Sequence, residues 1–346
     1  MTYDHVWSPT GPWAIHLLRV DRDSCWQLAA AKGGDAAIGR EPTSALVREL
    51  ARHERVVAGV NADFFLFSPP GVPRGAHVQE GRVITGPGDR PVIAADSSGT
   101  LFIGRLDVTG RVMAQGNVIP LEGWNRAVPR GLAFVDRAWG AASDTGSGSV
   151  EVVVAGTPLR VVTTDTAPAG VPIPIEGGVL VAGRDADAAA RRTLLGLRPG
   201  DTVSVQRAIT RPHLRTVVGG WPVIVRDSTV TPAADSAGAS FAPVRHPRTA
   251  VGIAHGGREL ILVVVDGRQK PYSDGMTLRE LAELFRSLGA TQALNLDGGG
   301  SSTFVLADSV APGGVRILNR PSDKVERAVG NALVVVRGCQ VRPGDR

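Results

Sequence analysis

The sequence predicts an α/β to α+β mixed fold: a large mixed sheet with flanking helices, a C-terminal βαβ unit and a β-rich insertion in the middle of the chain. Three observations predict it. Hydrophobic residues make up 43% of the 346 positions, which is enough to bury a full core. Apolar runs alternate with amphipathic helical stretches toward both ends of the chain. Between them, short β-like runs are separated by Gly, Pro and Asp turns.

The N-terminal segment, up to about residue 105, predicts alternating strands and helices. Ala14–Val20 reads as a strand, and Thr43–His53 carries its leucines and valine on one face, which predicts an amphipathic helix. The apolar run Val56–Val60 then predicts a buried strand. Asn61 and Asp63 follow this strand directly, so both polar side chains are expected at its carboxyl end.

The pattern changes between residues 106 and 210, where short β-like runs such as Val150–Ala155 dominate and only Ala186–Leu195 has a helical pattern. We expect this stretch to form a β-rich subdomain or an insertion within a larger domain. The domain as a whole is expected to span residues 11–336, with tails at residues 1–10 and 337–346.

The C-terminal part predicts a βαβ unit. Leu260–Val265 and Ala293–Leu296 read as strands, and Thr277–Leu288 reads as a helix that begins with a capping box. The strands should be parallel, and parallel strands end at the same edge of a sheet. Asp266 follows the first strand and Asp297 the second, so we expect both carboxylates at one edge, where α/β sheets bind ligands. A turn-capping role is the alternative for each aspartate.

The segment after Asp297 continues as Gly298-Gly299-Gly300-Ser301-Ser302. Three glycines permit positive φ and close backbone approach, so successive N–H groups can form a nest for a phosphate or another oxyanion. A tight, flexible turn is the alternative. Upstream, Arg248 opens an apolar strand, where it is placed to bind an anion or to cap a sheet edge.

Charge, apolar runs and cysteines limit the functional classes. The net charge is +5, and the basic residues, nearly all of them arginines, are scattered, so no nucleic-acid partner is expected. No apolar run reaches the ~18–20 residues of a membrane span. A structural zinc site is not expected, because no Cys/His cluster occurs. Cys25 and Cys339 are expected either to pair or to remain free thiols.

Seven segments occur in a specific order, namely NADFF at 61–65, HPRTAVGI at 246–253, LILVVVDGR at 260–268, the helical LRELA at 278–282, LNLDGGGSS at 294–302, NRPSD at 319–323 and ERAVGNAL at 326–333. Together they resemble the phosphodiester glycosidase family. That family includes the uncovering enzyme, N-acetylglucosamine-1-phosphodiester alpha-N-acetylglucosaminidase, and bacterial exported proteins linked to exopolysaccharide metabolism. The resemblance spans about residues 11–336 and is weakest between 106 and 210. Ala62 and Trp221 depart from it, because the family has Gly at both positions.

The resemblance implies a hydrolase that cleaves the C–O bond of a sugar-1-phosphodiester and releases a sugar and a phosphomonoester. Its substrate would be a phosphorylated saccharide or glycopolymer. Its location would be extracellular or in the cell envelope, although the N-terminus has no signal pattern and a cytoplasmic location stays open. The alternatives are a metal-dependent phosphodiesterase that cleaves the P–O bond and a non-catalytic binder of cell-wall or exopolysaccharide.

The family motifs imply site roles for the matching residues. The candidates for catalysis are Asp297, Asp266 and Asp63. The candidates for binding the sugar or the phosphate are Asn61, Arg248, Arg268, Gly298, Gly299, Gly300, Ser301, Ser302, Asn319, Asp323 and Arg327. We expect the arginines and the glycine loop to hold the phosphate, and an aspartate to act as base or nucleophile at the anomeric carbon. This chemistry needs no cofactor, but a divalent Mg, Mn or Ca ion held by the aspartates is an open alternative.

Overall fold

The computed structural model describes residues 1–9, 11–21, 25–86, 88, 90–106, 108–126, 130–143, 148–166, 170–209, 211 and 213–338. Within these residues the protein is mostly β, with six sheets and four α-helices. In the described part of the chain, only β12 (Gly123–Trp124) and β13 (Leu132–Val135) pair in parallel. The predicted α/β to α+β mixed fold, with its large mixed sheet, is therefore wrong.

The largest sheet has seven strands, each antiparallel to its neighbours, in the order β1-β2-β22-β21-β23-β19-β20. Strands β21 and β22 form a hairpin, whereas helix α4 (Leu278–Ser287) connects β22 to β23. The strands of this sheet are β1 (Thr2–Ser8), β2 (Trp13–Asp21), β19 (Val223–Arg226), β20 (Thr229–Val230), β21 (Arg248–Ala254), β22 (Glu259–Val265) and β23 (Ala290–Asn295).

The predicted βαβ segment is present, but its two strands do not pair with each other. Strand β21 lies between β22 and β23 and is antiparallel to both, so the outer two strands run parallel. Periodicity could not indicate this insertion, because fully buried strands carry the same apolar run in parallel and antiparallel sheets. Helix α4 begins at the predicted capping box, in which Thr277 Oγ1 accepts the Glu280 N–H at 3.1 Å. Gly252 of β21 lets α4 approach, since a Cβ there would lie 2.6 Å from the Phe285 ring.

Two five-stranded antiparallel sheets complete the body of the protein, in the orders β25-β24-β5-β27-β3 and β7-β6-β18-β8-β9. The first contains β3 (Trp26–Ala31), β5 (Arg55–Asn61), β24 (Phe304–Ala307), β25 (Val315–Ile317) and β27 (Ala332–Arg337). The second contains β6 (His77–Gln79), β7 (Arg82–Thr85), β8 (Val92–Asp96), β9 (Leu101–Gly104) and β18 (Leu214–Gly219).

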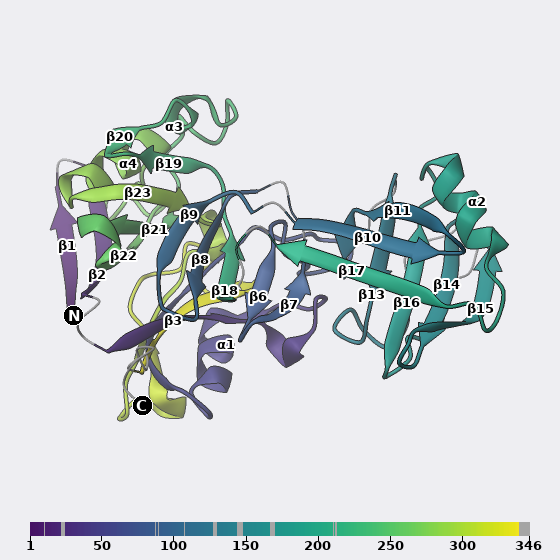
Figure 1. The fold of residues 1–346 in the computed structure, drawn as a ribbon. Helices are drawn as coiled ribbons and strands as arrows, with labels where there is room; N and C mark the ends of the chain where they lie inside the picture. Colours follow the sequence, from purple (N-terminus) through teal and green to yellow (C-terminus); the bar gives the residue numbers. More distant parts are fainter. Residues whose placement is uncertain are drawn as a thin grey trace.

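The main hydrophobic core fills the space between these three sheets, with side chains of β2, β21, β22 and β23 on one side and of β3, β5, β27, β8 and β18 on the other. Helices cover the outer faces. Helix α4 and the short α3 (Ala233–Ser236) cover the seven-stranded sheet, and α1 (Thr43–Leu50) covers the sheet that contains β5. Figure 1 shows α1 and α4 on opposite sides of the body. The helix and strand predicted around Thr43–His53 and Val56–Val60 are confirmed as α1 and β5.

A second lobe extends to the side of this body and contains the described residues between 108 and 209 (Figure 1). Its sheets have the orders β11-β10-β17 and β12-β13-β16-β14-β15, and a separate apolar core joins them to helix α2 (Ala188–Gly196). Whether this lobe is a domain of its own stays a prediction. Its remaining strands are β10 (Val108–Ala114), β11 (Asn117–Leu121), β14 (Val150–Ala155), β15 (Arg160–Thr166), β16 (Gly177–Ala182) and β17 (Val203–Ile209).

Smaller features complete the description. Strand β4 (Glu41–Pro42) pairs with β26 (Ala328–Val329). No helix among the described residues is long and apolar enough to cross a membrane. Cys339 lies outside the described residues, so the question of a bond between Cys25 and Cys339 stays open. Short 3-10 helices occur at Gly33–Asp35, His255–Gly257, Gly299–Ser301 and Pro312–Gly314.

Candidate active site

Two carboxylates come together where the seven-stranded sheet meets the five-stranded sheet that contains β5. Asp63 lies two residues after β5, and Asp297 lies two residues after β23. The Asp297 N–H donates to the Ala62 carbonyl at 2.8 Å, and Asn61 Nδ2 donates to the Asp297 carbonyl at 2.7 Å. These bonds connect the ends of two strands that are far apart in the sequence. We call Asp63 and Asp297 the carboxyl pair.

Asn61 is fully buried, and its side chain is engaged by the protein. Besides the bond to the Asp297 carbonyl, its Oδ1 accepts from Thr249 Oγ1 at 2.7 Å and from the Thr303 N–H at 3.1 Å. Asn61 therefore aligns β5, β21 and the segment before β24 at the site. Its direct contact with a substrate stays a prediction.

Asp63 has one carboxylate oxygen that the protein holds and one that it does not. Its Oδ2 accepts the Gly75 N–H at 2.5 Å, and its own N–H donates to Asn331 Oδ1 at 2.8 Å. Gly219 lies so close that a Cβ there would be 2.4 Å from Oδ2. Asp63 Oδ1 is buried and has no hydrogen-bond partner among the described residues. A buried, unpaired oxygen of this kind is suited to a ligand that completes the site.

Burial raises the pKa of both members of the carboxyl pair, because desolvation disfavours the ionised form. The pKa of Asp63 rises to about 7, and the nearby charge of Asp297 adds to this effect. The pKa of Asp297 rises to about 6. The guanidinium of Arg90 lowers both pKa values without cancelling the effect of burial. Between these two pKa values the carboxyl pair therefore holds about one proton, which resides on Asp63 in preference to Asp297.

Arg248 is completely buried at the start of β21. Its Nε donates to the Met276 carbonyl at 2.8 Å, and its Nη2 donates to the carbonyls of Phe241 and Val244 at 2.7 and 2.9 Å. Burial, together with the neighbouring Arg268, lowers the pKa of Arg248 to about 10. Its Nη1 is buried without a hydrogen-bond partner in the described part of the chain. Arg248 therefore braces the loop before β21 and retains one donor for an anion.

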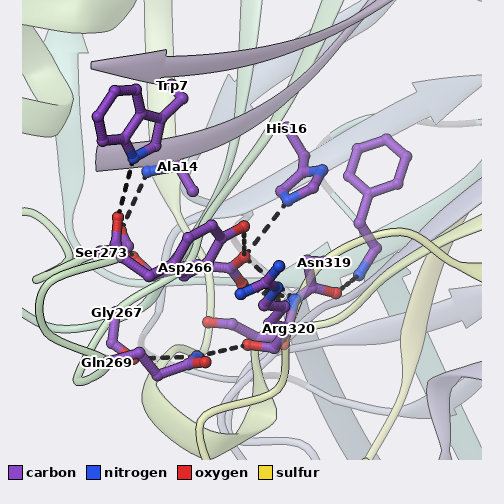
Figure 2. Close-up of polar contacts among 12 residues, drawn as sticks. Trp7, Ala14, His16, Asp266, Gly267, Gln269, Ser273, Asn319 and Arg320 are labelled. Atoms are coloured by element: carbon purple, nitrogen blue, oxygen red, sulfur yellow. Dashed lines mark hydrogen bonds and ion pairs between the residues drawn. The ribbon is translucent and has the colours of Figure 1, made fainter. Parts of the chain in front are cut away.

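Asp266 is also buried, but its carboxylate is fully engaged by the protein (Figure 2). Oδ1 accepts from Asn319 Nδ2 and from the Arg320 N–H, both at 3.0 Å. Oδ2 accepts from the Tyr272 hydroxyl at 3.1 Å and lies 3.4 Å from His16 Nε2. These contacts join the ends of β2 and β22 to the loop before β26. The catalytic role predicted for Asp266 has no support in this network.

The glycine loop contains the 3-10 helix Gly299–Ser301, and most of its backbone donors are already paired. The Gly298 N–H donates to Asp297 Oδ1 at 2.9 Å, and the next N–H donates to the Pro247 carbonyl at 2.9 Å. The two serine N–H groups donate within the loop itself. Binding of an anion by these N–H groups would therefore require intramolecular bonds to break. The Ser302 hydroxyl is buried and has no partner among the described residues.

Four further candidates surround this loop. Arg268 is exposed, with Nη2 3.1 Å from His246 Nδ1. Arg327 donates twice to Asp323 Oδ2, at 3.0 and 2.6 Å, and this ion pair is exposed. Both guanidinium groups pack against glycines of the loop. Asn319, in contrast, is buried, and its Nδ2 is bound to the Asp266 network.

The structure adds residues to the site that the sequence did not select. The Arg90 guanidinium lies 5.1 Å from the ring centre of Phe64 and 5.2 Å from that of Trp221. The ring of Phe241 stacks on that of Trp221, with centres 5.6 Å apart. The sequence places Phe64 only within the NADFF segment and marks Trp221 only as a departure from the family motif. Arg90 follows a Pro/Gly-rich stretch and carries no signal of its own.

The carboxyl pair offers few side-chain donors for a metal ion. No group of three or more His, Cys, Asp or Glu side chains that could hold a metal ion occurs among the described residues. The carboxyl pair offers two oxygen-bearing side chains and faces the positive charge of Arg90. Calcium takes about six to eight oxygen ligands, which the pair does not supply, whereas magnesium can be held by one or two carboxylates together with water and a substrate phosphate.

Known proteins with similar sequences support a relationship to glycosidases. The N-acetylglucosamine-1-phosphodiester alpha-N-acetylglucosaminidase of Mus musculus is 45% identical over 71 residues, which are 20% of this chain and 13% of that protein. The SPbeta prophage-derived uncharacterized protein YomE of Bacillus subtilis is 38% identical over 92 residues, which are 27% of this chain. The matched region again spans only 13% of that relative's length.

The match extends to solved structures and to a family profile. The crystal structure of a hypothetical protein from Synechocystis has a TM-score of 0.79 and 25% identity, and the alignment covers 97% of this chain and 61% of that chain. The sequence profile of the phosphodiester glycosidase family matches residues 148–336, which include Arg248, Asp266 and Asp297. Because this match covers more than half of the 346 residues, the chain belongs to the phosphodiester glycosidase family.

Proposed function

We propose that this protein hydrolyses the C–O bond between the anomeric carbon of a sugar and a phosphodiester, releasing the sugar and a phosphomonoester. The observation that supports this best is the carboxyl pair, whose pKa values rise to about 7 for Asp63 and about 6 for Asp297. Glycoside hydrolysis uses two carboxyl groups in different protonation states. The family, and the activity in the name of the mouse relative, favour the same type of bond.

Asp297 is the member of the pair that ionises first, so we assign it the role of base or nucleophile. As a base it removes a proton from water while the water oxygen bonds to the anomeric carbon. The bond from that carbon to the phosphate oxygen breaks, and its electron pair leaves with the phosphate. Asp63, which has the higher pKa of the two, holds the proton while Asp297 is ionised, and it donates a hydrogen bond to the substrate from its unpaired oxygen. Asp266 has no part in this mechanism, because its carboxylate already has three partners.

The phosphate is already a good leaving group, so it needs stabilisation of its charge more than it needs a proton. The unpaired Nη1 of Arg248 is one donor for this purpose. The substrate class is a phosphorylated saccharide or glycopolymer, and an extracellular or cell-envelope location belongs to the same proposal. Fractionation of the producing cells, followed by immunoblotting, would test the location.

Hydrolysis of a sugar-1-phosphodiester in ¹⁸O-labelled water tests which bond breaks. The proposed reaction adds water to carbon, so we expect the label in the released sugar when it is analysed before anomeric exchange. Label in the phosphomonoester would mean P–O cleavage and would favour the metal-dependent phosphodiesterase. Tight binding of the saccharide without release of either product would favour a non-catalytic glycan binder.

A further inference from the structure

We propose that Arg90 binds the phosphate of the substrate and that Trp221 holds the Arg90 guanidinium beside the carboxyl pair. The inference rests on the proposed function, since it assigns a residue to the phosphate that this reaction releases. The sequence motifs assign the phosphate to Arg248, Arg268 and the glycine loop. The contacts of the folded chain bring a further arginine, Arg90, to the carboxyl pair.

The backbone brings Arg90 and Trp221 next to each other at the carboxyl pair. The Gly220 N–H donates to the Pro91 carbonyl at 3.0 Å, which joins the two segments directly beside these residues. The glycine before Gly220 is the one that lies against the Asp63 carboxylate. Arg90 and Trp221 therefore lie at the ends of the neighbouring strands β8 and β18, beside Asp63.

The position of Trp221 is also linked to the second carboxylate. Its N–H donates to the Asn295 carbonyl at 2.7 Å, and its own carbonyl accepts from Asn295 Nδ2 at 2.7 Å. Asn295 ends strand β23, two residues before Asp297. The Trp221 backbone is thus held by two hydrogen bonds to Asn295, at the end of the strand that precedes Asp297.

Three aromatic rings, Phe64, Trp221 and Phe241, form a cluster that we call the aromatic cage. The Arg90 guanidinium lies at nearly equal distances from Phe64 and Trp221, 5.1 and 5.2 Å from the ring centres. Phe241 supports both rings: it stacks on Trp221 at an interplanar angle of 20° and meets Phe64 edge-on at 67°. Cation–π contacts hold a guanidinium by its face, so its in-plane N–H groups remain directed outward, the orientation that binds phosphate.

The positive charge of Arg90 acts on both members of the carboxyl pair. It lowers the pKa of Asp63 and of Asp297, so the guanidinium lies close to both carboxyls. Arg90 is half-buried, which leaves it accessible to a ligand while reducing the screening of its charge by water. A phosphate on the carbon that Asp297 attacks would therefore be attracted by the positive charge of this guanidinium.

The other arginines near the site contact backbone carbonyls or an acidic side chain. Arg248 supports three backbone carbonyls, and Arg126 donates to the carbonyls of Pro73 and Arg74. Arg327 is paired with Asp323. The Arg248 guanidinium also lies over a ring of the aromatic cage, 4.6 Å from the centre of Phe241, whereas the Arg90 guanidinium lies over two rings, those of Phe64 and Trp221.

The test measures phosphate binding and turnover on the full chain. We would titrate inorganic phosphate by calorimetry into the wild type, Arg90→Met, Arg90→Lys, Trp221→Phe and Trp221→Ala. The matched control is Arg207→Met, because Arg207 lies 4.0 Å from the ring centre of Trp124 in the second lobe and has the same kind of contact. Circular dichroism establishes that each variant is folded.

We expect Arg90→Met to weaken phosphate binding at least about tenfold, the loss of a charge-assisted contact. Trp221→Ala should weaken it about three- to tenfold, whereas Trp221→Phe keeps an aromatic face and stays within about twofold. The Arg207→Met control should bind like the wild type. With a sugar-1-phosphodiester, KM should rise more than kcat falls in Trp221→Ala. In Arg90→Met, but not in Arg90→Lys, the acid limb of the pH–rate profile should move to higher pH.

Two results would overturn the inference: a folded Arg90→Met that binds phosphate as tightly as the wild type, or a wild type that does not bind phosphate. Equal losses in Trp221→Phe and Trp221→Ala would reject the role of the aromatic face. The proposed function fails in a different way. In that case the wild type binds phosphate through Arg90 but releases no sugar from any phosphodiester.

Discussion

The protein should lose unfolding free energy as the pH rises from 5 to 8, and replacing Asp63 by Asn should remove a large part of this loss. The folded pKa of Asp63 is raised from 3.8 to about 7, so the folded protein binds a proton that the unfolded chain has already released. The stability that Asp63 contributes is therefore fully present below pH 3.8 and is lost as the pH rises toward 7. A shift of roughly 3 units at 1.36 kcal/mol each corresponds to about 4 kcal/mol, of which about 3 kcal/mol falls between pH 5 and pH 8.

Urea unfolding at pH 5 and pH 8 measures this difference. The wild type should lose about 3 kcal/mol more unfolding free energy over this interval than Asp63→Asn does. The matched control is Val218→Ala, a buried neighbour on β18 without a charge, which should cost the same amount at both pH values. An Asp63→Asn variant with the same pH dependence as the wild type would show that Asp63 is not a buried, proton-holding group. The assignment of acid and base roles within the carboxyl pair would then be wrong.

Three further outcomes can be measured. Asp297→Asn should lower kcat at least about 10³-fold and leave the far-ultraviolet circular dichroism unchanged; near-normal kcat in a folded variant would make Asp297 a turn residue. Arg248→Ala should lower the unfolding free energy by at least about 3 kcal/mol in urea titrations, because three backbone carbonyls lose a charged donor, and a stability equal to wild type would contradict its bracing role. Dialysis against a chelator should leave turnover intact; loss that magnesium restores would favour the metal-dependent phosphodiesterase.

The local elements were predictable because local chemistry specifies them. The capping box at Thr277 and Glu280 and the hydrophobic face of the helix around Leu46 are each encoded within about four residues of sequence. The polar residues at the ends of β5 and β23 were visible for the same reason, since Asn61, Asp63 and Asp297 each follow a buried apolar run.

Strand order could not be predicted in this way. The apolar runs of β21, β22 and β23 do not indicate which strands pair, and in the structure β21 lies between the other two. The predicted fold class was wrong for this reason: the βαβ pattern suggested a mixed sheet, whereas the strands of the observed sheet are antiparallel to their neighbours. A strand that is buried on both faces satisfies its backbone equally well beside a parallel or an antiparallel neighbour.

The sequence by itself determined that Asp63, Arg248, Asp266 and Asp297 are polar residues at the ends of buried strands, and its motifs indicated the family. Only the tertiary structure decided what each of them is available to do. The Asp266 carboxylate is occupied by Asn319, a residue far away in the chain, whereas Asp63 keeps an oxygen without a partner. The physical reason is that a side chain's hydrogen bonds, desolvation and neighbouring charges are set by segments that meet only when the sheets assemble.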